Sequence, residues 1–316
     1  MKKSLVRWLW ISRKGKALSY SCGNVSEFCM NKHAYLIIAH NNFYILKKLI
    51  ALIDDERNDI YIHIDKKTKN FKKDDFMNIC KKSHVYFIKR ISVYWGDYSQ
   101  VQCELNLLKA AIKGNYQYYH LISGVDLPIK SQDYIHDFFD INNNIEYVRF
   151  TDNWDYSRVS KIHILNKLNK TNNPLLIRIK ILFNKPFNYL YQKGYDYSQR
   201  FNSSIKKGDN WFSITDSAAK YIISQEKLIK KLFKYSLCSD EHFIHTILFN
   251  SKFKESLSYD TCLREIDWKR GRPYIYRKAD YGLLINSTNL FARKFDVSID
   301  KEIIDDIYLY VKKRQS

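Results

Sequence analysis

The sequence has few of the residues that interrupt regular structure, with 9 glycines and 4 prolines among 316 residues. Such a composition leaves little room for flexible linkers. Because 45% of the residues are hydrophobic, the chain can bury a sizeable core, and long-range disorder is excluded. The length fits one large α/β domain or two small ones.

Several patterns with well-defined chemistry are missing. The six cysteines include no C-x-x-C pair and no zinc-type spacing, which predicts reduced thiols rather than a metal site or a disulfide framework. No G-x-G-x-x-G or G-x-x-x-x-G-K-[ST] follows a predicted strand, which argues against a dinucleotide-dependent dehydrogenase and a P-loop kinase. No apolar run approaches the roughly eighteen residues that cross a bilayer.

The chain carries an excess of positive charge, with a formal net charge of +20. This balance favours anionic partners, which include nucleic acid, an anionic membrane surface and phosphorylated substrates. The lysines are spread along the whole sequence, so most of them are expected at ordinary solvated positions. The 25 tyrosines and 18 phenylalanines supply flat surfaces that pack in a core or stack on sugars and bases.

Strand and helix patterns alternate after residue 30. Continuous apolar runs predict buried parallel strands, and helical spacing of apolar residues lies between them. The ligand site of such a sheet lies at the carboxyl ends of its strands, where His40 and Asp65 are expected. The predicted strands are residues 34–40, 60–65, 85–88 and 118–123, and the predicted helices are residues 43–53 and 99–112.

The remaining segments are less regular. Residues 1–29 are expected to form a poorly structured extension, because Arg7 interrupts an apolar stretch that would otherwise resemble a signal peptide. A single domain is expected over residues 30–316. Within it, residues 142–209 are expected to be an irregular insertion or acceptor region, followed by a strand at 211–215 and one helix that runs from Thr215 or Asp216 to Leu232.

Two late motifs carry candidate chemistry. Asp240 and Glu241 precede an apolar run, and Lys294 lies about fifty residues further on. A carboxylate can take a proton from a hydroxyl, and a fixed cation can stabilise the phosphates of a leaving nucleotide. Together they indicate group transfer from an activated sugar. The alternative interpretation of the acidic pair is a helix start that favours the positive end of the helix dipole.

Seven blocks of this sequence resemble the core-2/I-branching β-1,6-N-acetylglucosaminyltransferases and the related peptide O-xylosyltransferases. The chain looks like a bacterial-type member of this family. The resemblance extends from about residue 34 to residue 296. Each block alone is a weak signal, whereas the ordered set is specific. The blocks are His40, His63-Ile64-Asp65-Lys66, Val93-Tyr94-Trp95-Gly96, residues 121–130, residues 211–215, Asp240-Glu241-His242-Phe243 and residues 291–296.

The resemblance implies a GT-A-type, Rossmann-like α/β fold, in which helices flank a mixed, mainly parallel sheet. It also implies an inverting transfer from a nucleotide sugar, with UDP-N-acetylglucosamine as the expected donor. Glu241 matches the base of the family, which deprotonates the acceptor hydroxyl. Asp240 is given a lesser role, in orienting a loop or capping a helix.

The resemblance further implies a reaction without a metal ion or any other cofactor. The sequence contains no Asp-X-Asp, the motif through which most enzymes of this fold bind a divalent cation. Lys294 matches one of the basic side chains that offset the charge of the leaving diphosphate. Arg272 is the candidate for the second, with Arg270 as the alternative, and a solvated loop remains an equal interpretation of both arginines.

Position within the family blocks suggests the other contacts. His40, Asp65, Trp95 and Asp126 are the candidates for binding the nucleotide and sugar, although a histidine or a tryptophan is more often a core residue. The candidates for the acceptor side are Arg158, Trp211 and Trp268.

The resulting expectation is a UDP-sugar-dependent glycosyltransferase that acts on a glycan or a lipid-linked acceptor in bacterial surface polysaccharide synthesis. A composition rich in Lys, Asn, Ile and Tyr indicates an AT-rich bacterial genome. We therefore expect a cytoplasmic enzyme with peripheral contact at the inner, anionic face of the cell membrane. The alternatives are transfer of xylose or of a different hexose such as glucose or galactose, and a basic module that binds polyanions; nucleic acid is the less favoured partner.

Overall fold

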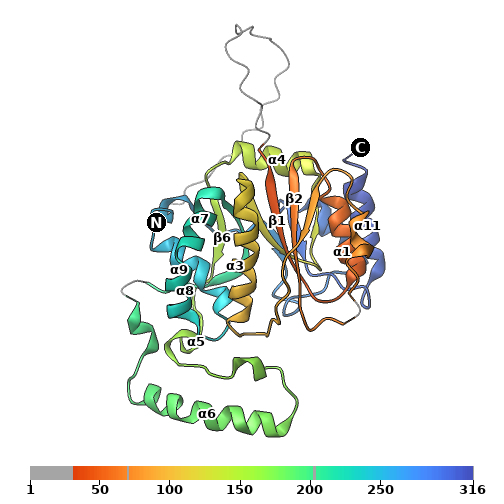
Figure 1. Cartoon of the computed structure of the whole chain (residues 1–316). Helices are drawn as coiled ribbons and strands as arrows, with labels where there is room; N and C mark the ends of the chain where they lie inside the picture. The colour runs from red at the N-terminus through yellow and green to blue at the C-terminus, as the bar shows by residue number, and fades with distance from the viewer. Residues whose placement is uncertain (1–30, 70, 202–203, 316) are drawn as a thin grey trace. The chain divides into compact units, whose positions relative to one another are not determined.

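The computed structural model describes residues 31–69, 71–201 and 204–315, and the expectation for residues 1–29 lies outside them. Within these residues the strands form a seven-stranded sheet and a three-stranded sheet (Figure 1). The larger sheet has the order β3-β2-β1-β4-β7-β6-β8. Its strands are β1 (His33–Ala39), β2 (Asn58–Ile64), β3 (His84–Phe87), β4 (Tyr118–Ser123), β6 (Glu146–Phe150), β7 (Gly208–Thr215) and β8 (Leu257–Tyr259).

One strand of this sheet runs opposite to the others. β1, β2, β3 and β4 are parallel to one another, whereas β7 runs antiparallel to both of its neighbours, β4 and β6. β8 pairs parallel with β6. The mixed, mainly parallel sheet that the sequence predicted is therefore confirmed.

Helices cover both faces of the sheet and bury two apolar cores. Alternate residues of β1 divide between them: Tyr35 and Ile37 pack with α1 and α11, and Leu36 packs with α3 and α7 (Figure 1). β2 is buried along its whole length, as expected for a parallel strand that is covered on both faces. The helices are α1 (Phe43–Leu52), α2 (Asp74–Met77), α3 (Ser99–Ala111), α4 (Gln132–Ile141), α5 (Ser157–Ser160), α6 (Pro174–Gln192), α7 (Asp216–Ser224), α8 (Glu226–Phe233), α9 (Phe243–Phe249), α10 (Tyr281–Asn286) and α11 (Lys301–Lys312).

The smaller sheet joins three distant parts of the chain. Its central strand β10 (Phe291–Arg293) pairs antiparallel with β5 (Leu127–Pro128) and parallel with β9 (Arg264–Ile266). This pairing brings the loop at Asp126 next to Lys294, although 168 positions (294 minus 126) separate them in the sequence.

The structure corrects the expectation that residues 142–209 are irregular. β6 is an integral strand of the large sheet, and α6 is a helix of 19 residues. The Asn173-Pro174 pair begins α6. Asn173 is the N-cap, whose side chain accepts a hydrogen bond from the backbone N–H of Leu175 at 2.9 Å, and Pro174 occupies the first helical position.

The helix predicted after β7 begins as expected and ends early. Thr215 is its N-cap, because its hydroxyl accepts from the backbone N–H of Ala218 at 3.3 Å. The single helix expected up to Leu232 is instead divided at Gln225 into α7 and α8. None of the helices among the described residues has both the length and the apolar character that a membrane span requires.

Candidate active site

A cavity of about 430 Å³ opens at the carboxyl ends of the parallel strands. His40 follows β1, Asp65 follows β2, and Ser123 ends β4, and all three residues line the cavity. This placement follows from the topology, since parallel strands bring their carboxyl ends to one edge of the sheet. The expected position of His40 and Asp65 at the carboxyl ends of the strands therefore agrees with their position in the cavity lining.

Basic side chains predominate around this cavity. The charged residues that line it are two acids, Asp65 and Glu104, and five bases, which are Lys67, Lys167, Lys170, Arg293 and Lys294. Burial raises the pKa of Glu104 well above its usual range, which disfavours a negative charge at this position. The cavity is therefore suited to an anionic ligand.

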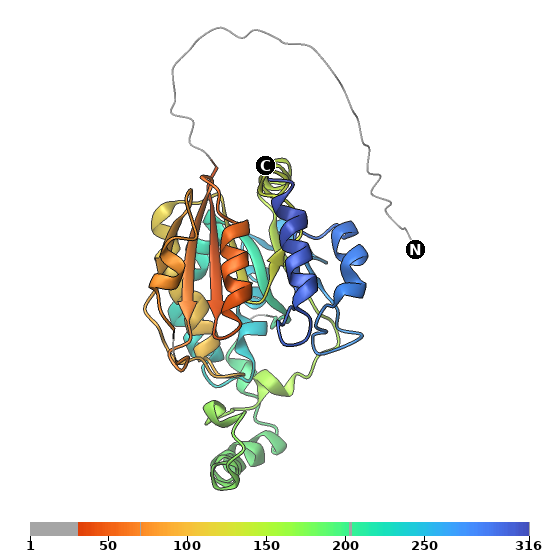
Figure 2. The same ribbon diagram turned by 90° about the vertical axis from the view of Figure 1, so that its right-hand side faces the viewer.

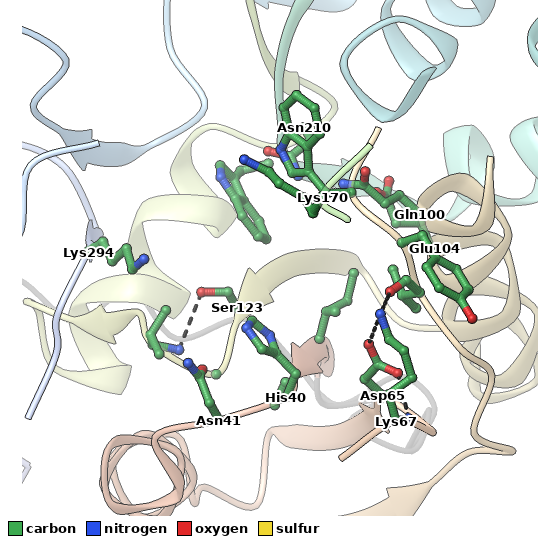
Figure 3. A pocket seen from close by; sticks show the side chains of 18 of the residues that line it. His40, Asn41, Asp65, Lys67, Gln100, Glu104, Ser123, Lys170, Asn210 and Lys294 are labelled. Atoms are coloured by element: carbon green, nitrogen blue, oxygen red, sulfur yellow. Dashed lines mark hydrogen bonds and ion pairs between the residues drawn. The ribbon is translucent and has the colours of Figure 1, made fainter. Parts of the chain in front are cut away.

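Lys294 has an unpaired ammonium. Within the described part of the chain, its Nζ forms no hydrogen bond or ion pair, and it points into the cavity opposite Asp65 and Lys67 (Figure 3). Lys67, in contrast, lies 3.5 Å from the Asp65 carboxylate. Arg293 donates to the Asp126 carboxylate at 2.9 Å and stacks on Trp211, with its guanidinium carbon 4.4 Å from the ring centre.

The predicted nucleotide contacts lie at or beside the cavity. Burial lowers the pKa of His40; Asp65 opposes this effect and Lys294 adds to it. Trp95 also lines the cavity, and with 53% of its surface exposed it is not a core residue. The ammonium of Lys170 lies 4.4 Å from the centre of its ring. Trp95 therefore presents an aromatic face at the rim, where a planar base could stack.

Asp126 has a different position. It is fully buried and is not among the residues that line the cavity. Its carboxylate accepts from the Ser123 hydroxyl at 2.6 Å and from Arg293 at 2.9 Å. Asp126 thus fixes two residues that do line the cavity, whereas the sequence had suggested that it contacts the nucleotide or sugar directly.

Glu241 is not among the residues that line the cavity, and its carboxylate lies in a basic environment. Its carboxylate accepts from Arg158 at 2.9 Å and lies 3.1 Å from the Lys207 ammonium. The neighbouring Asp240 accepts from Gln100 at 2.7 Å, and Gln100 lines the cavity. Glu241 closes a short 3-10 turn just before α9, so the helix-start interpretation describes its local position correctly and is compatible with a role in the site.

The two adjacent carboxyls have unlike surroundings. Burial, and to a lesser extent the charge of Glu241, raises the pKa of Asp240 to about 7. Glu241 is about one third exposed and pairs with two cations. Asp240 can therefore hold a proton near neutral pH. The role of Glu241 as the base stays a prediction.

The other predicted residues are not brought together. Trp211 lines the cavity from β7, whereas Trp268 is half exposed and does not line it. The guanidinium of Arg270 binds Asp267 at 2.5 Å and Asp280 at 2.7 Å, outside the cavity lining, and Arg272 is not part of the lining either. Arg158 reaches Glu241. The roles of these residues in binding diphosphate or acceptor stay predictions.

Sequence reasoning missed several lining residues, namely Lys67, Gln100, Glu104, Lys167, Lys170, Asn210 and Arg293. Two of them had a usable signal, because Lys67 follows Asp65 at the end of a strand and Arg293 precedes Lys294. No local pattern distinguishes Lys167 or Lys170 from the many solvated lysines.

Comparison with known proteins finds glycosyltransferases among the relatives of this chain. Rat (Rattus norvegicus) xylosyltransferase 2 is 22% identical over 310 residues, which cover 88% of this chain and 33% of that protein. A human (Homo sapiens) β-1,3-galactosyl-O-glycosyl-glycoprotein β-1,6-N-acetylglucosaminyltransferase is 25% identical over 288 residues, covering 84% of this chain and 66% of that protein. The chain thus spans about one third of the length of xylosyltransferase 2.

The similarity to solved structures is weak. Mouse xyloside xylosyltransferase 1 in its apo form matches 83% of this chain and 96% of that one, with 8% identity and a TM-score of 0.38. The strongest evidence is a family model, described as "Branch: Core-2/I-Branching enzyme", that matches residues 33–284. The chain therefore belongs to the Core-2/I-Branching enzyme family of glycosyltransferases.

Proposed function

We propose that this protein is an inverting, metal-independent glycosyltransferase that transfers a sugar from a UDP-sugar to a hydroxyl of an acceptor glycan. N-acetylglucosamine is the proposed sugar. The single observation that supports this proposal most is the basic cavity at the carboxyl ends of β1, β2 and β4, in which Lys294 presents an unpaired ammonium. A diphosphate is the ligand that such a cavity suits by charge.

Binding of the donor would use both ends of the cavity. The base would stack on Trp95, and Asp65 would accept hydrogen bonds from the uracil or the ribose. The diphosphate would lie at Lys294, with His40 and the Asp126 loop close to the sugar. Lys167 and Lys170 line the cavity and are candidates for a second cation, beside the predicted Arg272 and its alternative Arg270.

In the proposed reaction, Glu241 removes the proton of the acceptor hydroxyl as its oxygen attacks the anomeric carbon. The bond from that carbon to the diphosphate oxygen breaks, and UDP leaves with the bonding electrons, so that the configuration inverts. Arg158 and Lys207 hold the Glu241 carboxylate, which keeps it oriented. Fixed cations would stabilise the departing charge as a divalent metal does elsewhere.

The biological setting is also part of the proposal. The acceptor would be a glycan or a lipid-linked intermediate of surface polysaccharide synthesis. The enzyme would work in the cytoplasm, in peripheral contact with the inner face of a bacterial membrane. Trp211 in the lining and Arg158 at Glu241 are the proposed contacts on the acceptor side, with Trp268 further out.

The test is UDP release in the presence of EDTA. Purified protein is incubated with UDP-N-acetylglucosamine, first without acceptor and then with candidate glycans, with UDP-xylose, UDP-glucose and UDP-galactose in parallel. We expect UDP release that EDTA does not reduce and that an acceptor increases. A protein that binds only polyanions and neither retains nor cleaves any UDP-sugar would refute the proposal, and activity lost in EDTA and restored by manganese would refute metal independence.

A further inference from the structure

The long helix α6 exposes an apolar surface. None of its residues is buried, and Leu175, Leu182 and Phe183 are 64%, 65% and 55% exposed. Figures 1 and 2 show α6 set apart from the central sheet in both views. A single soluble chain seldom leaves so many large apolar side chains together in water.

Four of the exposed apolar side chains of α6 form a stripe, whereas the exposed Ile177 and Ile181 lie outside it. Leu175, Leu182, Phe183 and Leu190 follow the spacing i, i+7, i+8 and i+15, which places them on one side of a helix. The other side of α6 contacts the protein: the Asn184 amide bonds to the backbone of Ile164 at 2.9 and 3.0 Å. The stripe therefore points away from the rest of the chain.

The charge around this stripe has one sign. Residues 156–195 contain eight lysines and arginines and no aspartate or glutamate. Three of these cations, Arg178, Lys180 and Lys185, lie within α6 itself. An exposed apolar stripe flanked by cations is the pattern of a helix that lies in the headgroup region of a membrane.

We propose that α6 is a membrane-docking helix, whose apolar stripe inserts into the headgroup and acyl boundary of an anionic bilayer while the neighbouring cations contact lipid phosphates. Charge favours this occupant over a second copy of the chain. In a symmetric dimer through the stripe, each basic segment would face the same basic segment, with no acidic residue between positions 156 and 195 to compensate. Anionic headgroups supply the missing negative charge.

The same helix is linked to the rim of the cavity. Lys180 on α6 donates to the Asn169 side-chain oxygen, and the Asn169 amide donates to the backbone oxygen of Trp95 at 3.1 Å. Figure 2 shows α6 beyond the carboxyl ends of β1 and β2, the end at which the cavity opens. Docking would thus hold the cavity close to the bilayer surface, where a lipid-linked acceptor is found; this last step rests on the proposed function.

The test measures binding to vesicles of phosphatidylcholine with and without phosphatidylglycerol by co-flotation. We expect the protein to float with the anionic vesicles, and Leu182→Ser/Phe183→Ser to weaken this binding roughly tenfold or more. Arg178→Gln and Lys185→Gln should each weaken it about fivefold, and only with phosphatidylglycerol present. The matched control is Leu309→Ser on α11, since Leu309 is equally exposed at 63% and should leave binding unchanged.

Two results would overturn the inference. One is anionic-vesicle binding that Leu182→Ser/Phe183→Ser does not alter, while circular dichroism shows the variant folded. The other is a dimer in sedimentation equilibrium that this variant dissociates, with no binding to vesicles. UDP release from UDP-N-acetylglucosamine without vesicles reports separately on the proposed function, because it should persist in the variant whether or not α6 binds lipid.

Discussion

Replacing Lys294 with alanine tests the proposed donor site most directly. Its ammonium is partly buried, faces the cavity and has no carboxylate partner within the described residues. A bound diphosphate would therefore be its first counter-ion, with no existing ion pair to break. Lys67 is the internal contrast, because its ammonium already lies 3.5 Å from Asp65.

The magnitude follows from the kind of contact that is lost. A hydrogen bond between charged groups contributes about 1.5–3 kcal/mol net, which corresponds to a Kd for UDP that is roughly ten to 150 times higher in Lys294→Ala. The other cations of the cavity share the charge of the diphosphate, so the lower half of this range is expected. Lys67→Ala should weaken UDP binding less, because part of its charge is compensated by Asp65 in the free protein.

Isothermal titration of UDP in EDTA measures this effect. Lys294→Arg should retain most of the affinity, since the charge is kept. Lys47→Ala is the control for net charge, because it removes a cation from the exposed side of α1 outside the cavity lining. The difference between Lys294→Ala and wild type should shrink as salt is raised.

A second measurement, the pKa of His40 in the ligand-free protein, tests the effect of the Lys294 charge on the cavity. Burial is the main cause that lowers the pKa of His40, and Lys294 contributes in the same direction. The pKa of His40, followed by NMR, should therefore rise in Lys294→Ala. A folded Lys294→Ala protein that binds UDP as tightly as wild type would refute the assignment of Lys294 to the diphosphate.

Three further changes test the base, its neighbour and the fold. Glu241→Gln should retain UDP binding in titration calorimetry and lower the transfer rate by roughly a hundredfold or more, and full activity would identify a different base. Burial raises the pKa of Asp240 to about 7, so Asp240 should lower the stability of the folded protein as pH rises from about 4 to about 7, because only the unfolded chain ionises in that window. Asp240→Asn should remove this loss, and the Tm of the variant relative to wild type should therefore be higher at pH 7.5 than at pH 4.5. A Tm difference that stays constant between these pH values would contradict the assignment. Gly208→Ala should lower Tm strongly, because a Cβ there would lie 1.9 Å from the backbone oxygen of Arg149. Gly282→Ala is the control, since a Cβ at that position meets no atom within 4 Å, and its Tm should be unchanged or slightly raised. Equal effects of the two substitutions on Tm would refute this packing argument.

Local patterns of the sequence were sufficient for the parallel half of the sheet. The limits predicted for β4 agree with those observed, residues 118–123, and those for β1 and β2 differ by one or two residues. Buried parallel strands are continuous apolar runs, so their signal lies entirely in neighbouring residues. Because each run ends where polar residues begin, the same pattern also placed His40 and Asp65 at the mouth of the cavity.

The sequence by itself determined the α/β class, the strand ends that line the cavity, and the family blocks that carry Glu241 and Lys294. Tertiary structure alone decided that β7 runs antiparallel, that β6 completes the sheet, and that α6 leaves the sheet with its apolar stripe exposed. It also decided which cations are free: Arg270 binds Asp267 and Asp280, while Lys294 binds no carboxylate in the described chain. The physical reason is sequence separation. Burial and periodicity can be recognised from residues that are close together in the sequence, whereas ion pairs and strand direction depend on groups that only folding brings together.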